Sequence, residues 1–265
     1  MNYTLHRGSA PLLVSIPHMG TTIPEPLQAG YVPRALDVED ADWHLHRLYG
    51  FARDLGASLL QPSVARYVID LNRPPDDAPM YPGASNTELC PTRFFSGEPL
   101  YREGSAPSAD ERLQRRVAYW EPYHRALQEE LQRLKAQHGW ALLWDGHSIR
   151  AEIPWLFEGR LPDLNIGTAN GASAHPAITE AVARAAGHHP EFTHVVNGRF
   201  KGGYITRQYG KPPEHVHAVQ LEMCQYLYMR EAPPYDWDEN AASRVTPVVR
   251  EMVEAALDAG RRLHG

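Results

Sequence analysis

At 265 residues, with 43% hydrophobic and 22% charged residues, the chain has the composition of an ordinary globular protein, which argues against disorder. Its formal net charge of −6 excludes the basic surface expected of a protein that binds nucleic acid or membranes. Residues 1–9 lack a secretory pattern, no apolar run reaches membrane length, and only two cysteines are present. We therefore expect a cytoplasmic protein with two unpaired thiols, Cys90 and Cys224.

The first quarter of the chain alternates short apolar runs with one helical pattern. Strands are predicted over 12–16, 57–60 and 67–71, where apolar residues are consecutive. A helix is predicted over 42–55, because apolar residues recur there at helical spacing and Gly56 follows as a natural stop.

A long segment without periodic signals comes next. Residues 73–107 are rich in Pro, Gly and Ser, and no second domain-sized core precedes them. So long an excursion is typical of a functional loop. We predict a single domain, 1–265, with a substrate-covering loop at about 73–107.

The remaining pattern continues the alternation of helices and strands. Ser108-x-x-Glu111 is a capping box that opens a helix reaching about residue 138, which Pro122 should kink or split. Strands are predicted over 140–144, 192–196 and 216–224, and helices over 175–186 and 241–263. The alternation predicts an α/β fold with helices on both faces of a mixed, mostly parallel sheet.

Polar residues follow the apolar runs repeatedly. In parallel α/β sheets, ligands bind at the carboxyl ends of the strands, so five such segments would deliver polar groups to one rim. The residues in question are His18, Asn72 and Arg73, Asp145 and His147, Asn197, and Glu222.

Two of these residues are candidate metal ligands. His18 and His147 both lie at predicted strand ends, and a catalytic zinc site with three protein ligands would need one further oxygen donor. Sequence alone offers Glu39, Asp40 and Asp42 for that donor, and does not choose among them.

The other histidines are predicted to be structural or on the surface. His44 and His46 are two apart on a predicted helix and so point to different faces. The pairs His188–His189 and His215/His217 have no carboxylate nearby in a matching pattern. The HExxH motif of helical zinc proteases is absent.

Glu222 is the candidate general base. Strand alternation places Val219 and Leu221 on one face, and Gln220 and Glu222 on the other. A carboxylate near the end of an apolar strand is costly unless it is functional or paired, and a salt bridge to an arginine is the alternative interpretation.

Candidate substrate-binding residues cluster in the same segments. Arginine matches a carboxylate through two parallel hydrogen bonds, and Asn72-Arg73 would form a carboxylate clamp. Gly203 would let the backbone approach a ligand closely. The remaining cations are Arg66, Arg150, Arg199, Lys201 and Arg207.

Six blocks in fixed order carry a family resemblance that spans residues 12–230. They are Ser-Ile-Pro-His-Met-Gly, Asp-Ala-Asp-Trp-His, Arg-Tyr-Val-Ile-Asp-Leu-Asn-Arg-Pro, Asp-Gly-His-Ser-Ile-Arg, Asn-Gly-Arg-Phe-Lys-Gly-Gly-Tyr-Ile-Thr-Arg and Val-Gln-Leu-Glu-Met-Cys. The ordered set resembles the N-formylglutamate amidohydrolase (N-formylglutamate deformylase) family of histidine degradation.

The resemblance implies a fold similar to zinc carboxypeptidases and aspartoacylase, of the phosphorylase/hydrolase-like type, with one catalytic metal ion. By that analogy His18, Asp42 and His147 match the metal ligands, and Glu222 matches the catalytic glutamate. Zinc is the expected ion, with cobalt or manganese as alternatives. The chain departs from those peptidases at Thr21, where they place their acidic ligand.

The implied activity is hydrolysis of N-formyl-L-glutamate to L-glutamate and formate, so the expected partner is a small anionic amino-acid derivative. A related metallo-deacylase or a carboxypeptidase-like hydrolase acting on another N-acyl amino acid is the alternative within enzymes. A non-catalytic binding protein for acidic amino acids is the alternative outside them. The sequence predicts no oligomeric state.

Overall fold

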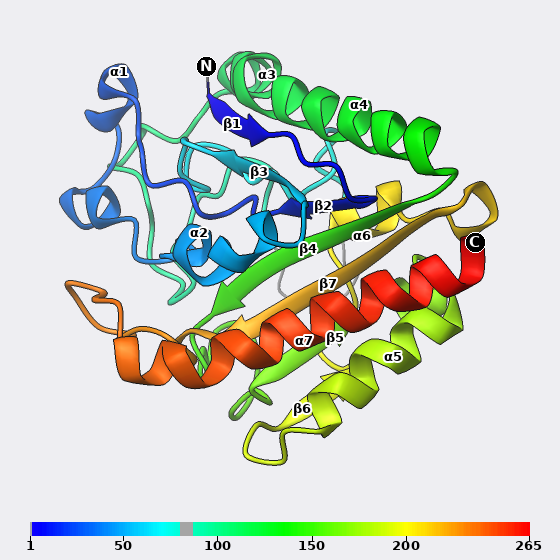
Figure 1. Ribbon diagram of the computed structural model, residues 1–265. Coiled ribbons are helices and arrows are strands. Elements are labelled where there is room, and N and C mark those ends of the chain that lie inside the picture. Colours follow the sequence, from blue (N-terminus) through cyan, green and yellow to red (C-terminus); the bar gives the residue numbers. More distant parts are fainter. Residues whose placement is uncertain (1, 80–86) are drawn as a thin grey trace.

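The computed structural model describes residues 2–79 and 87–265, which form one mixed sheet with helices on both faces (Figure 1). The described residues contribute seven strands to it, in the order β1-β3-β2-β4-β7-β5-β6. The strand bounds are β1 Tyr3–His6, β2 Leu12–Ser15, β3 Ser58–Pro62, β4 Ala141–Ile149, β5 Leu164–Gly167, β6 His194–Val196 and β7 Val216–Cys224.

The centre of the sheet is parallel. β2 pairs in parallel with β3 and with β4, β4 pairs in parallel with β7, and β5 pairs in parallel with β6. The antiparallel pairs are β1 with β3 and β5 with β7. The predicted mixed, mostly parallel α/β fold is therefore confirmed.

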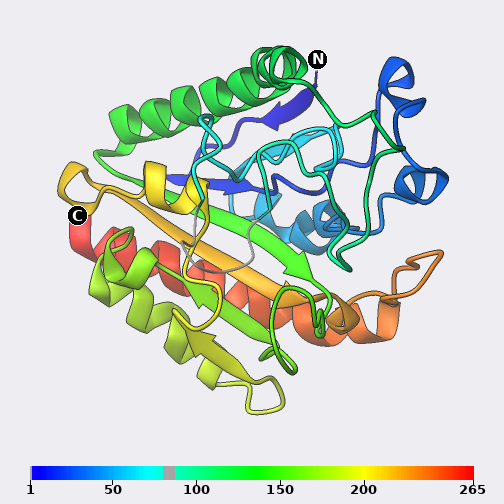
Figure 2. The same cartoon turned by 180° about the vertical axis from the view of Figure 1, so that it is seen from behind.

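The helices cover the two faces unequally. Helix bounds are α1 Glu25–Gln28, α2 Leu45–Leu48, α3 Ala109–Arg115, α4 Glu121–His138, α5 Pro176–Gly187, α6 Tyr204–Tyr209 and α7 Glu239–His264. α5 and α7 run together across one face, where they pack on alternate residues of the central strands such as Trp144 and Leu221 (Figure 1). α4 and α6 lie on the opposite face, over residues such as Leu143 and Ala218 (Figure 2).

Local signals explain where several helices begin and end. Ser108 caps α3 by accepting a hydrogen bond from the backbone N–H of Glu111, as the capping box predicts. A π-helical segment, Arg116–Trp120, separates α3 from α4, and Pro122 occupies the first turn of α4, where its missing N–H costs nothing. Pro122 thus splits the long helix as expected.

The helix predicted over 42–55 is mostly wrong. It is reduced to the single turn of α2 and a 3-10 segment, Tyr49–Arg53. The reason is local, because His44 adopts a left-handed conformation with φ of 60° and the helix can begin only after it. Leu45, Leu48 and Phe51 are nevertheless buried, so the apolar spacing reported burial correctly.

The strand predicted over 67–71 is also wrong. These residues form consecutive turns, with the N–H of Val68 bonded to Ala65 and the N–H of Asp70 bonded to Leu89. Tyr67, Val68 and Leu71 are buried in the core beside the sheet, so the apolar run indicates burial without strand pairing.

The strand predicted over 140–144 is longer than expected. β4 continues to Ile149, so Asp145 and His147 lie within a buried strand and not after it. β1, β5 and α6 were not predicted, since four- to six-residue elements carry little periodic signal. The remaining predicted strands and the helices over 175–186 and 241–263 are confirmed within a few residues.

The segment at 73–107 contains neither helix nor strand among its described residues. Phe94, Phe95 and Leu100 anchor it in the core, so it is a buried, packed loop along these positions. Across the described chain, none of the helices has both the length and the apolarity needed to cross a membrane.

Candidate active site

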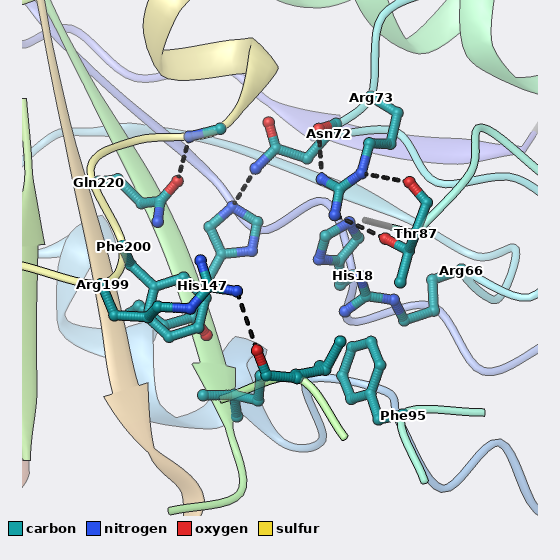
Figure 3. Close-up of a pocket in the computed structure, with 14 residues that line it drawn as sticks. His18, Arg66, Asn72, Arg73, Thr87, Phe95, His147, Arg199, Phe200 and Gln220 are labelled. Atoms are coloured by element: carbon teal, nitrogen blue, oxygen red, sulfur yellow. Dashed lines mark hydrogen bonds between the residues drawn. The ribbon is translucent and has the colours of Figure 1, made fainter. Parts of the chain in front are cut away.

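A pocket lies at the carboxyl ends of β2, β4 and β7, which are neighbours in the sheet (Figure 3). It opens on the face that carries α4 and α6, because Gln220 and Glu222 point away from the α7 side. Eight of the twelve predicted site residues line it: His18, Arg66, Asn72, Arg73, His147, Arg199, Gly203 and Glu222.

His18, Asp42 and His147 meet beneath this pocket. One donor atom from each lies within 4.8 Å of the others, and all three side chains are buried. The rings of His18 and His147 are 4.8 Å apart, and Asp42 Oδ2 is 3.8 Å from Nδ1 of His18 and 3.3 Å from Nδ1 of His147. Of the three acids that the sequence left open, Asp42 is the one that lies against both histidines.

The outer nitrogens of both histidines face further carboxylates. Nε2 of His18 is 2.7 Å from Asp70 Oδ1, and Nε2 of His147 is 3.2 Å from Asp145 Oδ1. A proton on Nε2 of His18 is thereby stabilised, which leaves its Nδ1 with a lone pair on the side of Asp42. Such carboxylate–histidine pairs are a common support for histidines that bind metal.

Two buried oxygens support the same interpretation. Oδ1 of Asp42 and Oδ1 of Asp145 lack a hydrogen-bond partner among the described residues, although a buried carboxylate oxygen without one is costly. Asp42 Oδ2 accepts a hydrogen bond from the N–H of Ser148, which fixes the carboxylate in place. The donor set, two imidazoles and a carboxylate, fits one divalent transition-metal ion.

Glu39 and Asp40 are engaged elsewhere. Glu39 pairs with Arg34 through two hydrogen bonds of 2.7 Å. Asp40 accepts hydrogen bonds from the hydroxyl of Tyr67, the N–H of Phe95 and the guanidinium of Arg150. These contacts anchor the segment that carries Asp42.

Glu222 lies beside the histidine–aspartate cluster. It is next to His147 in the register of β4 and β7, and it is 8% exposed. The pKa of Glu222 is raised to about 8, chiefly by burial and also by the nearby carboxylates of Asp42 and Asp145, against the opposing effect of His147 and Arg66. No salt bridge holds Glu222 among the described residues, so the structural alternative to a catalytic role has no contact to support it.

Arg66 is buried next to the cluster. Its Nη2 donates to Asp70 at 2.8 Å, its Nη1 is 3.8 Å from Asp42, and its guanidinium stacks 4.6 Å from the centre of the Phe95 ring. These contacts hold a permanent positive charge in the wall of the pocket.

Asn72 and Arg73 form the wall next to Arg66. Asn72 Oδ1 accepts from the N–H of Ile205, and its Nδ2 is 2.9 Å from Nε2 of His147. Arg73 is braced on Thr87, donating from Nε to the backbone oxygen and from Nη2 to the hydroxyl. The structure therefore places both predicted clamp residues in the pocket, although in a turn and not after a strand.

Arg199 and Gly203 approach from the other side, on the loop after β6. Arg199 donates to the backbone oxygen of Leu156 and lies over Phe200. Gly203 is packed so tightly that a Cβ there would lie 2.3 Å from Asn72 Nδ2.

Three predicted substrate-binding cations do not line the pocket. Arg150 pairs with Asp40 at 2.8 Å, and Arg207 donates to the backbone oxygen of Gly202 and is exposed. Lys201 is half-buried on the neighbouring loop. Asn197, expected at the rim, instead accepts hydrogen bonds from the N–H groups of Thr168 and Asn170.

Several pocket residues were missed from the sequence. An apolar and aromatic wall consists of Phe95, Ile149, Leu156 and Phe200, and two polar residues, Thr87 and Gln220, complete the lining. Asp70 was also missed as the partner of His18; its spacing of four from Arg66 was the available signal.

Comparisons with known proteins show the family of the chain. The model of the family described as "N-formylglutamate amidohydrolase" matches residues 10–229. The N-formylglutamate deformylase of Pseudomonas aeruginosa is 53% identical over 258 residues, 96% of each chain. That of Pseudomonas putida is 49% identical over 254 residues, 96% of this chain and 95% of the relative.

A solved structure extends the match to the fold. The N-formylglutamate amidohydrolase from Ralstonia eutropha JMP134 superposes with a TM-score of 0.81 over 98% of this chain and 97% of the other, at 24% identity. The family match and both relatives cover nearly the whole of the fold described above, including every residue of the His18–Asp42–His147 cluster. The chain belongs to the N-formylglutamate amidohydrolase family.

Proposed function

We propose that this protein hydrolyses N-formyl-L-glutamate to L-glutamate and formate, with one divalent metal ion, as a cytoplasmic step of histidine degradation. The observation that carries the proposal is a buried Glu222 with a raised pKa, next to a His18–Asp42–His147 cluster. Membership of the family, and the name N-formylglutamate deformylase of two relatives at about 50% identity, support the choice of substrate.

His18, Asp42 and His147 would hold the metal ion through two nitrogens and one oxygen. Zinc suits this donor set best, and cobalt or manganese are the alternatives. When bound, such an ion supplies Lewis acidity that makes a water molecule nucleophilic near neutral pH.

Glu222 moves the proton in this reaction. Its carboxylate accepts a proton from the attacking water, whose oxygen adds to the formyl carbon. Glu222 then donates that proton to the departing nitrogen as the C–N bond breaks, so that formate and the amine of L-glutamate are released. A bound cation would favour the ionised form of Glu222 that the first step needs.

Arg66 is placed to stabilise the negative charge that develops on the formyl oxygen. It is the buried cation nearest the cluster, and Asp70 and Phe95 keep its guanidinium in one orientation. A preorganised charge of this kind typically lowers the barrier by about 3–4 kcal/mol.

The two carboxylates of the substrate need separate anchors. Asn72 and Arg73 on one side, and Arg199 on the other, supply donors, and Gly203 lets its loop approach Asn72 closely. Each arginine contributes selectivity because it is left poorly paired when a substrate lacks its carboxylate. Arg150, Lys201 and Arg207 support the surrounding loops in this proposal.

Formate release by the purified protein tests the proposal. N-formyl-L-glutamate should be hydrolysed much faster than N-acetyl-L-glutamate or N-acetyl-L-aspartate, with about one metal ion per chain. Activity should vanish on chelation and return with zinc. Preference for an acetylated substrate would favour a related deacylase, and binding of N-formyl-L-glutamate without turnover by the metal-loaded protein would favour a binding protein.

A further inference from the structure

Gln220 lines the pocket, and of the two polar atoms in its side chain only the oxygen is hydrogen-bonded among the described residues. It lies on β7, two residues before Glu222 and on the same face, and it is 3% exposed. Its Oε1 accepts a hydrogen bond of 2.7 Å from the N–H of Gly203. Its Nε2 has no hydrogen-bond partner among the described residues, and Gln220 lines the pocket.

The bond from Gly203 determines how the amide is oriented. A backbone N–H can only donate, so the oxygen of Gln220 must face the loop and the NH₂ group must face the pocket. Figure 3 shows the amide oxygen directed at that loop and the nitrogen turned away from it. A donor is thereby presented to whatever occupies the space that Arg199 and Phe200 also line.

The start of α6, residues 203–205, also orients the side-chain amide of Asn72. The N–H of Ile205 bonds to Oδ1 of Asn72, so residues 203–205 direct the NH₂ groups of both Asn72 and Gln220 away from this segment. Nδ2 of Asn72 is 2.9 Å from Nε2 of His147, so of the two amides it is Gln220 whose NH₂ group has no partner among the described residues.

The distance along β7 distinguishes the two carboxylates of the substrate. A strand advances about 3.3 Å per residue, so Gln220 and Glu222 are about 6.6 Å apart along it. In an extended N-formylglutamate, the γ-carboxyl carbon lies five bonds, about 6 Å, from the formyl carbon. The α-carboxyl carbon is only three bonds away, at most about 3.8 Å, which is too close for a group at Gln220 when the formyl carbon is at Glu222.

We propose that Gln220 is a specificity-determining residue whose Nε2 donates a hydrogen bond to the γ-carboxylate of the substrate, on the side of the pocket where Arg199 lies. This assignment rests on the proposed function, which names N-formyl-L-glutamate as the substrate. Gln220 binds substrate and takes no part in proton transfer.

Gln220→Glu is the discriminating substitution. The new carboxylate still accepts the bond from Gly203, but it presents an anionic oxygen where the NH₂ group was. The kcat/KM for N-formyl-L-glutamate should fall about 100-fold or more, mainly through KM. N-formyl-L-glutamine should be hydrolysed better than by the unmodified protein, because its γ-amide can donate to the new carboxylate. Gln132→Glu on the exposed face of α4 adds the same charge away from the pocket, and it should leave kcat/KM for both substrates unchanged.

Gln220→Met separates substrate binding from a purely structural role. It removes the donor with little change in length, so kcat/KM for N-formyl-L-glutamate and N-formyl-L-glutamine should fall about tenfold. N-formyl-L-norvaline, which has a methyl group in place of the γ-carboxylate, should be unaffected. Equal losses for all three substrates, or an unchanged KM in both variants, would overturn the assignment.

Binding of the product makes the test independent of turnover. By calorimetry, the metal-loaded protein should bind L-glutamate more tightly than L-glutamine, and Gln220→Glu should reverse that order. A protein that releases no formate from N-formyl-L-glutamate would refute the proposed function. If the protein releases formate but Gln220→Glu still binds L-glutamate more tightly than L-glutamine, only the role of Gln220 would be refuted.

Discussion

Two clusters of histidines lie at opposite ends of β7, and their surroundings differ. At the carboxyl end, His18 lies next to Asp42 and Asp70, and His147 lies next to Asp42 and Asp145. At the amino end, His217 lies 2.8 Å from His264 and near the rings of His175 and His215. None of these amino-end histidines forms an ion pair with a carboxylate among the described residues.

The difference shows that proximity of histidines is not sufficient for a metal site. Nδ1 of His217 accepts a hydrogen bond from the N–H of His175, so its remaining nitrogen carries the proton and has no lone pair for an ion. At the carboxyl end, Nε2 of His18 donates a hydrogen bond to Asp70, which leaves Nδ1 of His18 available, and Asp145 places a negative charge 3.2 Å from Nε2 of His147. Neighbouring carboxylates therefore favour the carboxyl-end cluster, and not the amino-end one, as the proposed metal site.

The largest expected effect comes from removing a ligand at the carboxyl end. His147→Ala should lose the bound metal and nearly all formate release, because two donors cannot retain the ion. His217→Gln at the other end should keep about one metal ion per chain and nearly normal turnover. Metal content by mass spectrometry and formate release measure both, and loss of metal in His217→Gln would contradict the comparison.

Removing the proton carrier should be nearly as damaging. Glu222→Gln has the same shape but cannot accept or return a proton, so kcat should fall by about 10²- to 10⁴-fold. Metal content should remain at one ion per chain, because Glu222 is not among the three ligands. Near-normal turnover in this variant would remove Glu222 from the mechanism.

A smaller effect is expected from Asp145, which supports His147. Asp145→Asn should weaken zinc affinity by about 10- to 100-fold, because the negative charge 3.2 Å from the ring of His147, which makes that imidazole a stronger ligand, is lost. Competition with a chelator of known affinity measures this change. Turnover at saturating zinc should fall much less than in Glu222→Gln, and an unchanged affinity would show that Asp145 does not orient His147.

The smallest effect concerns stability at the amino end. The pKa of His217 is lowered to about 4, chiefly by burial and also by the neighbouring His264, His175 and His215. A histidine with a lowered pKa destabilises the fold as pH falls, because the unfolded chain takes up the proton first, from about pH 6.5 downward. The free energy of unfolding of the chelated protein should therefore fall by on the order of 1–2 kcal/mol between pH 6.5 and 4.5. His217→Phe should show a flatter dependence in urea titrations, and identical slopes would refute the assignment.

The sequence predicted burial and the class of fold well, and local conformation less well. The apolar run at 67–71 is buried, but it forms turns and not the predicted strand. Apolar composition does not reveal whether a neighbouring strand is available to pair. The metal-ligand histidines could be proposed from the turn and the strand that carry them. The residue pattern alone does not distinguish Asp42 from Asp40 as the acidic ligand. The structure does, because it shows that Tyr67, Phe95 and Arg150 already form hydrogen bonds with Asp40.

The substrate-binding cations show the same limit. Six were proposed from their neighbourhood in the sequence, yet only Arg66, Arg73 and Arg199 line the pocket. The direction of a long side chain on a loop depends on backbone angles that the sequence does not encode locally. Gln220 escaped selection for the opposite reason, because a neutral residue beside Glu222 on a strand carries no distinctive signal.

The start of α6, residues 203–205, constrains how the sequence of this pocket can change in evolution. Its backbone contacts Asn72 and Gln220, which are 148 positions apart in the chain, and any side chain at position 203 would collide with Asn72. A relative could alter the length of acyl amino acid that it accepts by displacing this segment, while retaining every arginine. Within such a lineage Gly203 would tolerate fewer substitutions than the charged residues around it, although it contributes no side chain to the chemistry.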